Sequence, residues 1–265
     1  MAPILLLLLL LMAVCPLIAW QKATVDRFLK NAIWPFAVGV LAAIILVVVG
    51  VKGTFAIIGL ASTVFMFATH VQEFLQGTRA RMKATKENIA KAIYKLTRKN
   101  QRRYGGYIVH IGVALIAIGV ISSHAYPEDI LKTVERGENI AIGDYVLTFN
   151  GLTEQTENGN GIVTADLKVD YNGKNVGSIN PEKIFYETWP EPSTEVAIKT
   201  NWKEDLYVVL SSWENSEKIT LQVKVNPFVS WIWIGGGIMV FGTAIALIGG
   251  RTNSTGLLKA FRAGR

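Results

Sequence analysis

The stretch QRRYGGYIVHIGVALIAIGVISSH, residues 101–124, contains an apolar run of membrane-spanning length. Two arginines, Arg102 and Arg103, and two glycines precede the run, and His110 lies three residues into it. A hydrophobic run of this kind predicts a membrane helix, although at Tyr107–Ser122 it is short for a span of about 20 residues. It also raises the question of why an imidazole lies inside it.

Hydropathy predicts a polytopic α-helical membrane protein of about five spans. The chain has 265 residues, of which 51% are hydrophobic, and a mean hydropathy of +0.33. The candidate spans are Pro3–Trp20, Ile33–Val51, Thr54–Val71, Tyr107–Ser122 and Pro227–Gly250. The first run lacks a basic n-region and a small-x-small cleavage site, so we interpret it as a retained helix. Because this run follows Met1 directly, we expect further sequence upstream.

The charge distribution predicts the orientation. Basic residues dominate the loop 21–31, the segment 72–106, which has ten Lys/Arg against two Glu, and the tail 251–265. By the positive-inside rule these segments are cytoplasmic, and the block between the last two spans is outside. That block, residues 124–225, has nine Lys/Arg and 17 Asp/Glu, so it is acidic. The net charge of +7 therefore does not indicate nucleic-acid binding.

The predicted organisation has four parts. They are a membrane bundle at 1–123 with four spans, an extracytoplasmic β domain at 124–226, a last span at 227–250 and a cytoplasmic tail at 251–265. Within the bundle, apolar residues at helical spacing predict one amphipathic helix over the basic segment 72–106. It would lie on anionic lipid or dock a partner subunit.

Short alternating runs predict that the outer block is all-β. The predicted strands are DYVLTFNGL, VTADLKVDY, TEVAIKT, DLYVVLSSW and KITLQVKV, with a hairpin turn at YNGK, residues 171–174. We expect a small sandwich or barrel, with a proline-rich loop at 179–195. The block has no nucleophile–base set or phosphate loop, and the single cysteine, Cys15, excludes a disulfide framework within the chain.

His110 is the first candidate for a functional residue. It lies seven residues from Arg103, about 10 Å along a helix, and a polar side chain inside a span often marks function. Ala114 and Ala117 follow one and two turns later. Small residues beside an imidazole permit close helix packing, and they also leave room for a macrocycle whose iron the imidazole ligates. Both interpretations are open.

The chain has two other histidines. His70 ends the third predicted span, where it can reach the headgroup region. Its depth is similar to that of His110, so an internal bis-histidine pair is conceivable. His124 lies where the fourth predicted span leaves the membrane, and we interpret it as a solvated interfacial residue.

The sequence resembles the CcmF family of bacterial cytochrome c haem lyases, including the related NrfE-type subunits. The resemblance covers nearly the whole chain in the order of the family. The matching pieces are LLLLLLLMAVCPLIAW, VQEFLQGTRAR, RRYGGYIVHIGVALIAIGV, INPEKIFYETWPEPSTEVAIKTNWKEDLYVVL and NPFVSWIWIGGGIMVFG.

The resemblance implies a haem lyase of cytochrome c maturation in the bacterial inner membrane. Such an enzyme joins haem to apocytochrome c outside the membrane and holds a haem b between two helix-borne histidines. His110 would be the second of these ligands, with Ala114 and Ala117 facing the haem. The implied partners are haem-delivery and apocytochrome-handling proteins, apocytochrome c and the lipid membrane.

The chain also departs from the family. The tryptophan-rich outer segment, two outer histidines and the first membrane histidine of the family are all missing here. We therefore expect the C-terminal portion of a CcmF, from a split or truncated gene, which is inactive without an N-terminal portion. The alternative is a non-catalytic membrane scaffold that binds partners, with His110 as an interhelical hydrogen-bonding residue.

Overall fold

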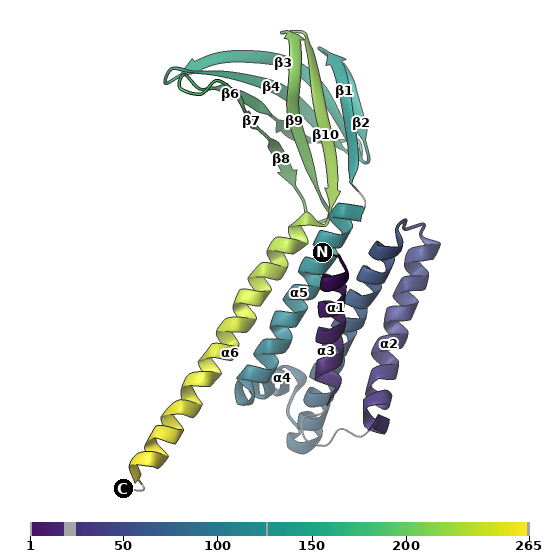
Figure 1. Cartoon of the computed structure of the whole chain (residues 1–265), viewed down its shortest axis with the longest axis vertical. Helices are drawn as coiled ribbons and strands as arrows, with labels where there is room; N and C mark the ends of the chain where they lie inside the picture. Colours follow the sequence, from purple (N-terminus) through teal and green to yellow (C-terminus); the bar gives the residue numbers. More distant parts are fainter. Residues whose placement is uncertain (1, 19–24, 126, 264–265) are drawn as a thin grey trace. The chain divides into compact units, whose positions relative to one another are not determined.

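The chain folds into two compact units (Figure 1). The computed structural model describes residues 2–18, 25–125 and 127–263. The helical unit comprises residues 1–121 and 231–265, and the β unit comprises residues 122–230. An all-β insertion between two helices of a membrane bundle is the fold class that the sequence predicts.

The helical unit contains both long and short helices. They are α1 (Ala2–Val14), the 3-10 turn η1 (Cys15–Leu17), α2 (Val25–Val48), α3 (Thr54–Thr85), α4 (Ile89–Lys99), α5 (Gln101–Ala125) and α6 (Val229–Ala263). Four of the described helices, α2, α3, α5 and α6, are long and apolar enough to cross a membrane. The first predicted span is shorter than expected, since α1 has 13 residues, about 20 Å. Residues 19–24, where that predicted span ends, lie outside the described residues.

The prediction of one amphipathic helix over 72–106 is wrong in its bounds, because an amphipathic helix, α4, covers only Ile89–Lys99, between the end of α3 and the start of α5. Helix α3 continues past its apolar part to Thr85, because Lys, Arg and Ala continue a helix readily. It ends where Lys86 adopts a left-handed conformation with φ of 53°. Glu87 then accepts hydrogen bonds from Arg81 on α3 and Lys95 on α4, which holds the corner between these helices.

Helices α5 and α6 pack through glycines that repeat every seven residues. A Cβ atom on Gly112 would lie 2.6 Å from the Gly235 carbonyl oxygen, and one on Gly105 would lie 2.8 Å from the Gly242 carbonyl oxygen. Such a close approach of two backbones requires glycine. The two contacts pair an early residue of α5 with a late residue of α6, so the helices run antiparallel.

The β unit consists of two sheets. The strands are β1 (Glu128–Glu135), β2 (Asn139–Ile142), β3 (Tyr145–Glu157), β4 (Asn160–Tyr171), β5 (Lys174–Ile179), β6 (Glu182–Phe185), β7 (Ser193–Glu195), β8 (Ala197–Thr200), β9 (Glu204–Asn215) and β10 (Lys218–Pro227). One sheet has the order β1-β10-β9-β8, and the other has β2-β3-β4-β6-β7 with β5 also paired to β4. All the described pairings are antiparallel.

Residues from both sheets form the core of the β unit. Alternate residues of β10 are buried, as expected for a strand with one face on the core. Asn172 and Gly173, both with positive φ, form the hairpin turn predicted at YNGK. The loop predicted at 179–195 is wrong in part, because β6 and β7 lie within it. Strands β1, β2 and β5 have no counterpart among the predicted strands.

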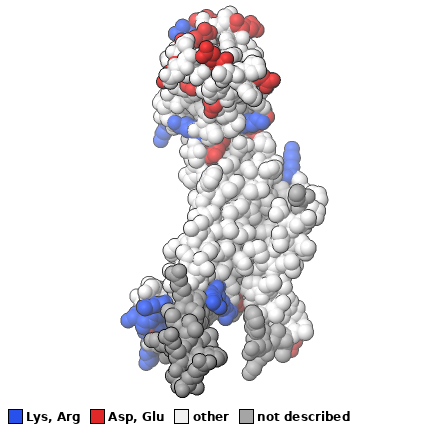
Figure 2. Space-filling view, turned by 60° about the vertical axis from the view of Figure 1, so that its left-hand side comes forward, with Lys and Arg blue, Asp and Glu red and all other residues white. Residues whose placement is uncertain are grey.

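Charged residues differ between the two units. Figure 2 shows carboxylates scattered over the β unit, whereas Lys and Arg of the helical unit gather mainly at one end. Helix α4 carries Lys91, Lys95, Arg98 and Lys99. The acidic block and the basic segments that the sequence predicts thus belong to different folded units.

Candidate functional site

Two of the three histidines of the chain meet inside the helical unit. The His70 side chain on α3 is fully buried, and its Nε2 lies 2.7 Å from Nδ1 of His110 on α5. The Nδ1 of His70 lies 2.8 Å from the Met66 carbonyl oxygen, one turn earlier on α3. The two imidazole rings are nearly perpendicular, at 86°. The His70 side chain is therefore packed inside the helical unit, whereas the sequence suggested that it can reach the headgroup region.

The geometry excludes one metal ion shared by these two nitrogens. An ion between two imidazole nitrogens needs about 4 Å between them, since each bond is about 2 Å long. The observed 2.7 Å is a hydrogen-bond distance. In this structure His70 and His110 form a hydrogen-bonded pair and not two ligands of one ion. The hydrogen bond uses Nδ1 of His110 and leaves its Nε2 for another partner.

A polar layer lies one turn from the histidine pair. Arg103 donates from Nη2 to the Glu73 carboxylate at 2.6 Å and from Nε to the Tyr107 hydroxyl at 2.8 Å. The Tyr107 hydroxyl also donates to Glu73, at 3.3 Å. The Tyr107 ring contacts His70 edge to face, with 5.4 Å between ring centroids. The arginine that precedes the apolar run is therefore connected to the imidazole pair inside it.

The small residues after His110 are packed. Ala114 is fully buried in a cluster with Leu9, Ala13 and Met66, and Ala117 packs against this cluster. Helices α1 and α3 therefore occupy the face of α5 that was expected to face a macrocycle. In this arrangement Ala114 and Ala117 pack against other side chains of the helical unit.

The third histidine lies apart from this pair. His124 is exposed near the end of α5, 14 residues beyond His110, which is about 21 Å along a helix. The described residues contain no group of three or more His, Cys, Asp and Glu side chains that could hold a metal ion.

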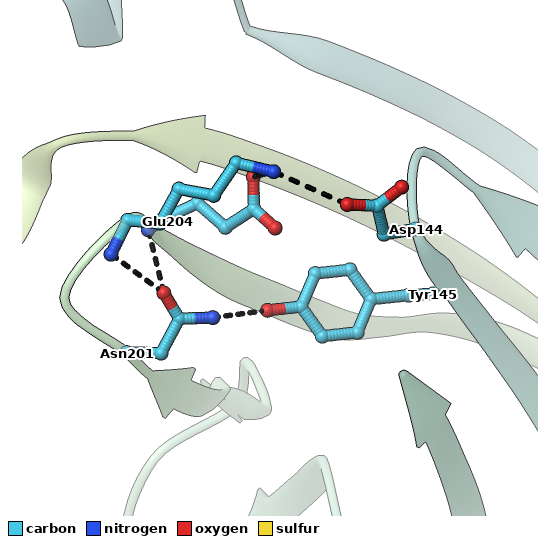
Figure 3. Close-up of polar contacts among 5 residues, drawn as sticks. Asp144, Tyr145, Asn201 and Glu204 are labelled. Carbon is cyan, nitrogen blue, oxygen red and sulfur yellow. Dashed lines mark hydrogen bonds and ion pairs between the residues drawn. The ribbon is translucent and has the colours of Figure 1, made fainter. Parts of the chain in front are cut away.

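The β unit contains a second polar cluster, which the sequence did not reveal (Figure 3). Asn201 donates to the Tyr145 hydroxyl at 2.8 Å and accepts from the backbone N–H of Lys203 and of Glu204. Lys203 pairs with Asp144 at 3.1 Å. The buried Glu204 carboxylate has one oxygen without a hydrogen-bond partner. The residues of this cluster come from two sequence segments, 144–145 and 201–204, which only the folded sheets bring together.

Burial changes the acidity of this cluster. It raises the pKa of Glu204 above its ordinary value, which the nearby Lys203 opposes only in part. Burial also raises the pKa of the Tyr145 phenol. The neighbouring Asp205, which also has an unpaired oxygen, has its pKa raised by burial as well. The cluster holds the turn at 201–204 against β3, and we assign it a structural role.

Comparison with known proteins identifies related chains. Residues 125–227 match the family described as CcmF C-terminal beta-sandwich. The cytochrome c-type biogenesis protein CcmF of Pseudomonas fluorescens is 32% identical over 251 residues, which are 93% of this chain and 36% of that relative. CcmF of Escherichia coli K12 is 31% identical over 163 residues, which are 60% of this chain and 25% of that protein.

A solved structure has a similar fold. It is titled cytochrome c haem lyase CcmF, and it superimposes with a TM-score of 0.73 at 26% identity. The match covers 93% of this chain and 39% of that structure. This chain thus spans a little over a third of its longer relatives. It belongs to the CcmF family of cytochrome c-type biogenesis proteins, of which it represents the C-terminal portion.

Proposed function

We propose that this chain is a component of a cytochrome c haem lyase and that His110 ligates the iron of a membrane haem b. The observation that carries the proposal is that, within the described part of the chain, only one of the two ring nitrogens of His110 is hydrogen-bonded. Its Nδ1 bonds to His70, whereas none of the hydrogen bonds of the described residues engages its Nε2. The relatives named for cytochrome c biogenesis and haem lyase supply the choice of haem.

The donor chemistry fits an iron porphyrin. A neutral imidazole with one nitrogen held by a hydrogen bond is the usual axial ligand of haem iron. The His110 residue is partly exposed in the helical unit, and its Nε2 is the nitrogen that would bind the iron. When bound, the haem supplies one-electron redox chemistry. The described residues of this chain hold the ring of His110 through its hydrogen bond with His70.

The second axial ligand would come from another polypeptide segment. His70 is turned toward His110, and His124 lies about 21 Å away along α5. We therefore propose that this chain works with an N-terminal CcmF portion that supplies the opposing histidine. Haem-delivery proteins and apocytochrome c are the further partners, and covalent attachment of haem takes place outside the membrane.

The orientation is part of the same proposal. The basic segments 21–31, 72–106 and 251–265 would share one side of the membrane, because an even number of predicted spans separates them in the sequence. The positive-inside rule makes that side cytoplasmic in a bacterial inner membrane. The β unit, inserted between α5 and α6, is then periplasmic.

Spectroscopy of the complex tests the ligand assignment. The chain is co-expressed with the N-terminal portion of a CcmF, and a reduced-minus-oxidised spectrum of the purified complex is recorded. We expect a b-type haem signal that is lost in His110→Ala and retained in the control His124→Ala. A signal unchanged in His110→Ala would overturn the assignment. The chain would then be better described as a partner-binding scaffold whose His110 is a hydrogen-bonding residue.

A further inference from the structure

We infer that His70 is a positioning residue that sets the tautomer of His110, so that the lone pair of His110 lies on Nε2, the nitrogen that does not face His70. The inference rests on the proposed function only for the identity of the ligand. The direction of the hydrogen bonds follows from the chain itself and can be tested without haem.

The chain of hydrogen bonds starts at a backbone carbonyl. The Met66 carbonyl oxygen lies 2.8 Å from Nδ1 of His70, and a carbonyl can only accept. The proton of neutral His70 is therefore on Nδ1, which leaves Nε2 as an acceptor. The Met66 carbonyl thus decides the protonation of a side chain one turn later.

The second hydrogen bond follows from the first. The Nε2 of His70 accepts, so Nδ1 of His110, 2.7 Å away, must be the donor. A neutral imidazole carries only one N–H, and Nε2 of His110 is then the unprotonated nitrogen. The opposite direction would require a charged His70. That charge would be fully buried in an apolar helix bundle, which is unfavourable.

The consequences for a metal ligand are specific. Only the unprotonated nitrogen of an imidazole can bind a metal ion, and a hydrogen bond from its other nitrogen makes the ligand more basic. His70 therefore holds His110 ready to bind through Nε2. It also orients the ring, because α3 and the Tyr107 ring fix His70 in turn.

Nitrogen NMR on the haem-free chain tests the tautomer directly. The chain has three histidines, so labelling with [15N]histidine gives three imidazoles, which His124→Gln and His70→Phe help to assign. We expect His110 to carry its proton on Nδ1 in the wild type and to populate both tautomers in His70→Phe. A wild-type His110 protonated on Nε2 overturns the inference, whether or not the complex binds haem.

Measurements on the co-expressed complex test the effect on the ligand. Loss of the His70 acceptor should raise the haem reduction potential and weaken haem binding about 10- to 100-fold in His70→Phe. His70→Gln, whose amide oxygen can accept from His110, should restore both toward wild type. Thr69→Val is the control, because Thr69 is buried beside His70 but bonds only to its own helix.

The outcomes separate the two proposals. If the wild-type complex has no b-type haem signal, the proposed function fails, and NMR alone decides on the tautomer. If haem binds but His70→Phe has the potential and affinity of the wild type, the positioning role is wrong while His110 remains the ligand. Equal changes in Thr69→Val and His70→Phe would also overturn it, since they would report only disturbed packing.

Discussion

A neutral imidazole in a membrane helix has two polar nitrogens, and each needs a partner or a ligand. Both nitrogens of His70 are satisfied, one within its own helix and one by His110. Two other buried polar side chains of α3 are also satisfied within the helix, since Thr63 and Thr69 each donate to the carbonyl four residues earlier. The Nε2 of His110 stands out against this background, which is why a single ring edge carries the functional proposal.

Removing the cation beside the buried Glu73 should destabilise the helical unit. The Arg103 side chain is more than half exposed, but its guanidinium bonds to a carboxylate that is 10% exposed. Arg103→Gln leaves that carboxylate with a weaker partner, at an expected cost of about 1–3 kcal/mol. Arg102→Gln is the matched control, because Arg102 is exposed and its substitution removes the same charge. Thermal unfolding in detergent checks this, and equal losses in both variants would contradict it.

Glu204 should make the β unit less stable as the pH rises. Its pKa is raised in the folded chain above the ordinary value of 4.5, so the folded state holds this proton more tightly than the unfolded state. The contribution of this group to stability is therefore fully present below that value and is lost as the pH rises through the folded pKa. Glu204→Gln should remove this part of the slope. Glu214→Gln, at an exposed position on the same strand, should keep it.

Hydrogen exchange of strands β9 and β10 in the intact chain measures how the stability of the β unit changes with pH. The difference between wild type and Glu204→Gln isolates one carboxyl group from the many others that titrate in the same range. A pH slope that is the same in both chains would mean that Glu204 does not contribute.

At the scale of elements, periodicity located the helices and the long strands but not their ends. Hydropathy marks where a helix leaves the membrane, whereas α3 continues for another 14 residues beyond Val71 because its basic residues are good helix formers. Strands β6 and β7 were hidden in a proline-rich segment. They are short, at four and three residues, and pairing with neighbouring strands determines them more than their own composition does.

The glycines of α5 should differ sharply in their tolerance of alanine. Gly112→Ala places a methyl group 2.6 Å from the Gly235 carbonyl oxygen, so α5 and α6 must separate, at a cost of about 1–3 kcal/mol. At Gly106 a Cβ atom meets no atom within 4 Å. Gly106→Ala should be neutral or stabilise by up to about 1 kcal/mol, the difference in helix propensity.

Thermal unfolding of the two variants provides the measurement for this pair. The change in the midpoint should have opposite sign or at least very different size at the two positions. Similar midpoints for Gly112→Ala and Gly106→Ala would show that the close approach of α5 and α6 does not stabilise the unit.

At the scale of the whole molecule, the sequence predicted the fold class and singled out His110 as a candidate. A histidine inside a span is visible in a single sequence, so His110 could be singled out. A pair with His70 was conceivable from their similar depth, but His70 lies 40 residues earlier at the end of an apolar run, so the sequence could not show that the two side chains meet. Depth in the membrane was the only shared property of the two residues. Their hydrogen bond depends on how α3 and α5 rotate against each other, which packing decides.

The chain alone should bind haem through one histidine only. Of its three histidines, His70 is used to hold His110 and His124 is about 21 Å from it along α5. Haem added to the purified chain in detergent should therefore give the spectrum of iron with a single imidazole ligand. Co-expression with the N-terminal portion should convert it to the low-spin spectrum of two imidazoles, because a second chain brings the opposing ligand. Electron paramagnetic resonance distinguishes these states, and a low-spin bis-imidazole signal from the chain alone would mean that His70 or His124 moves to the iron.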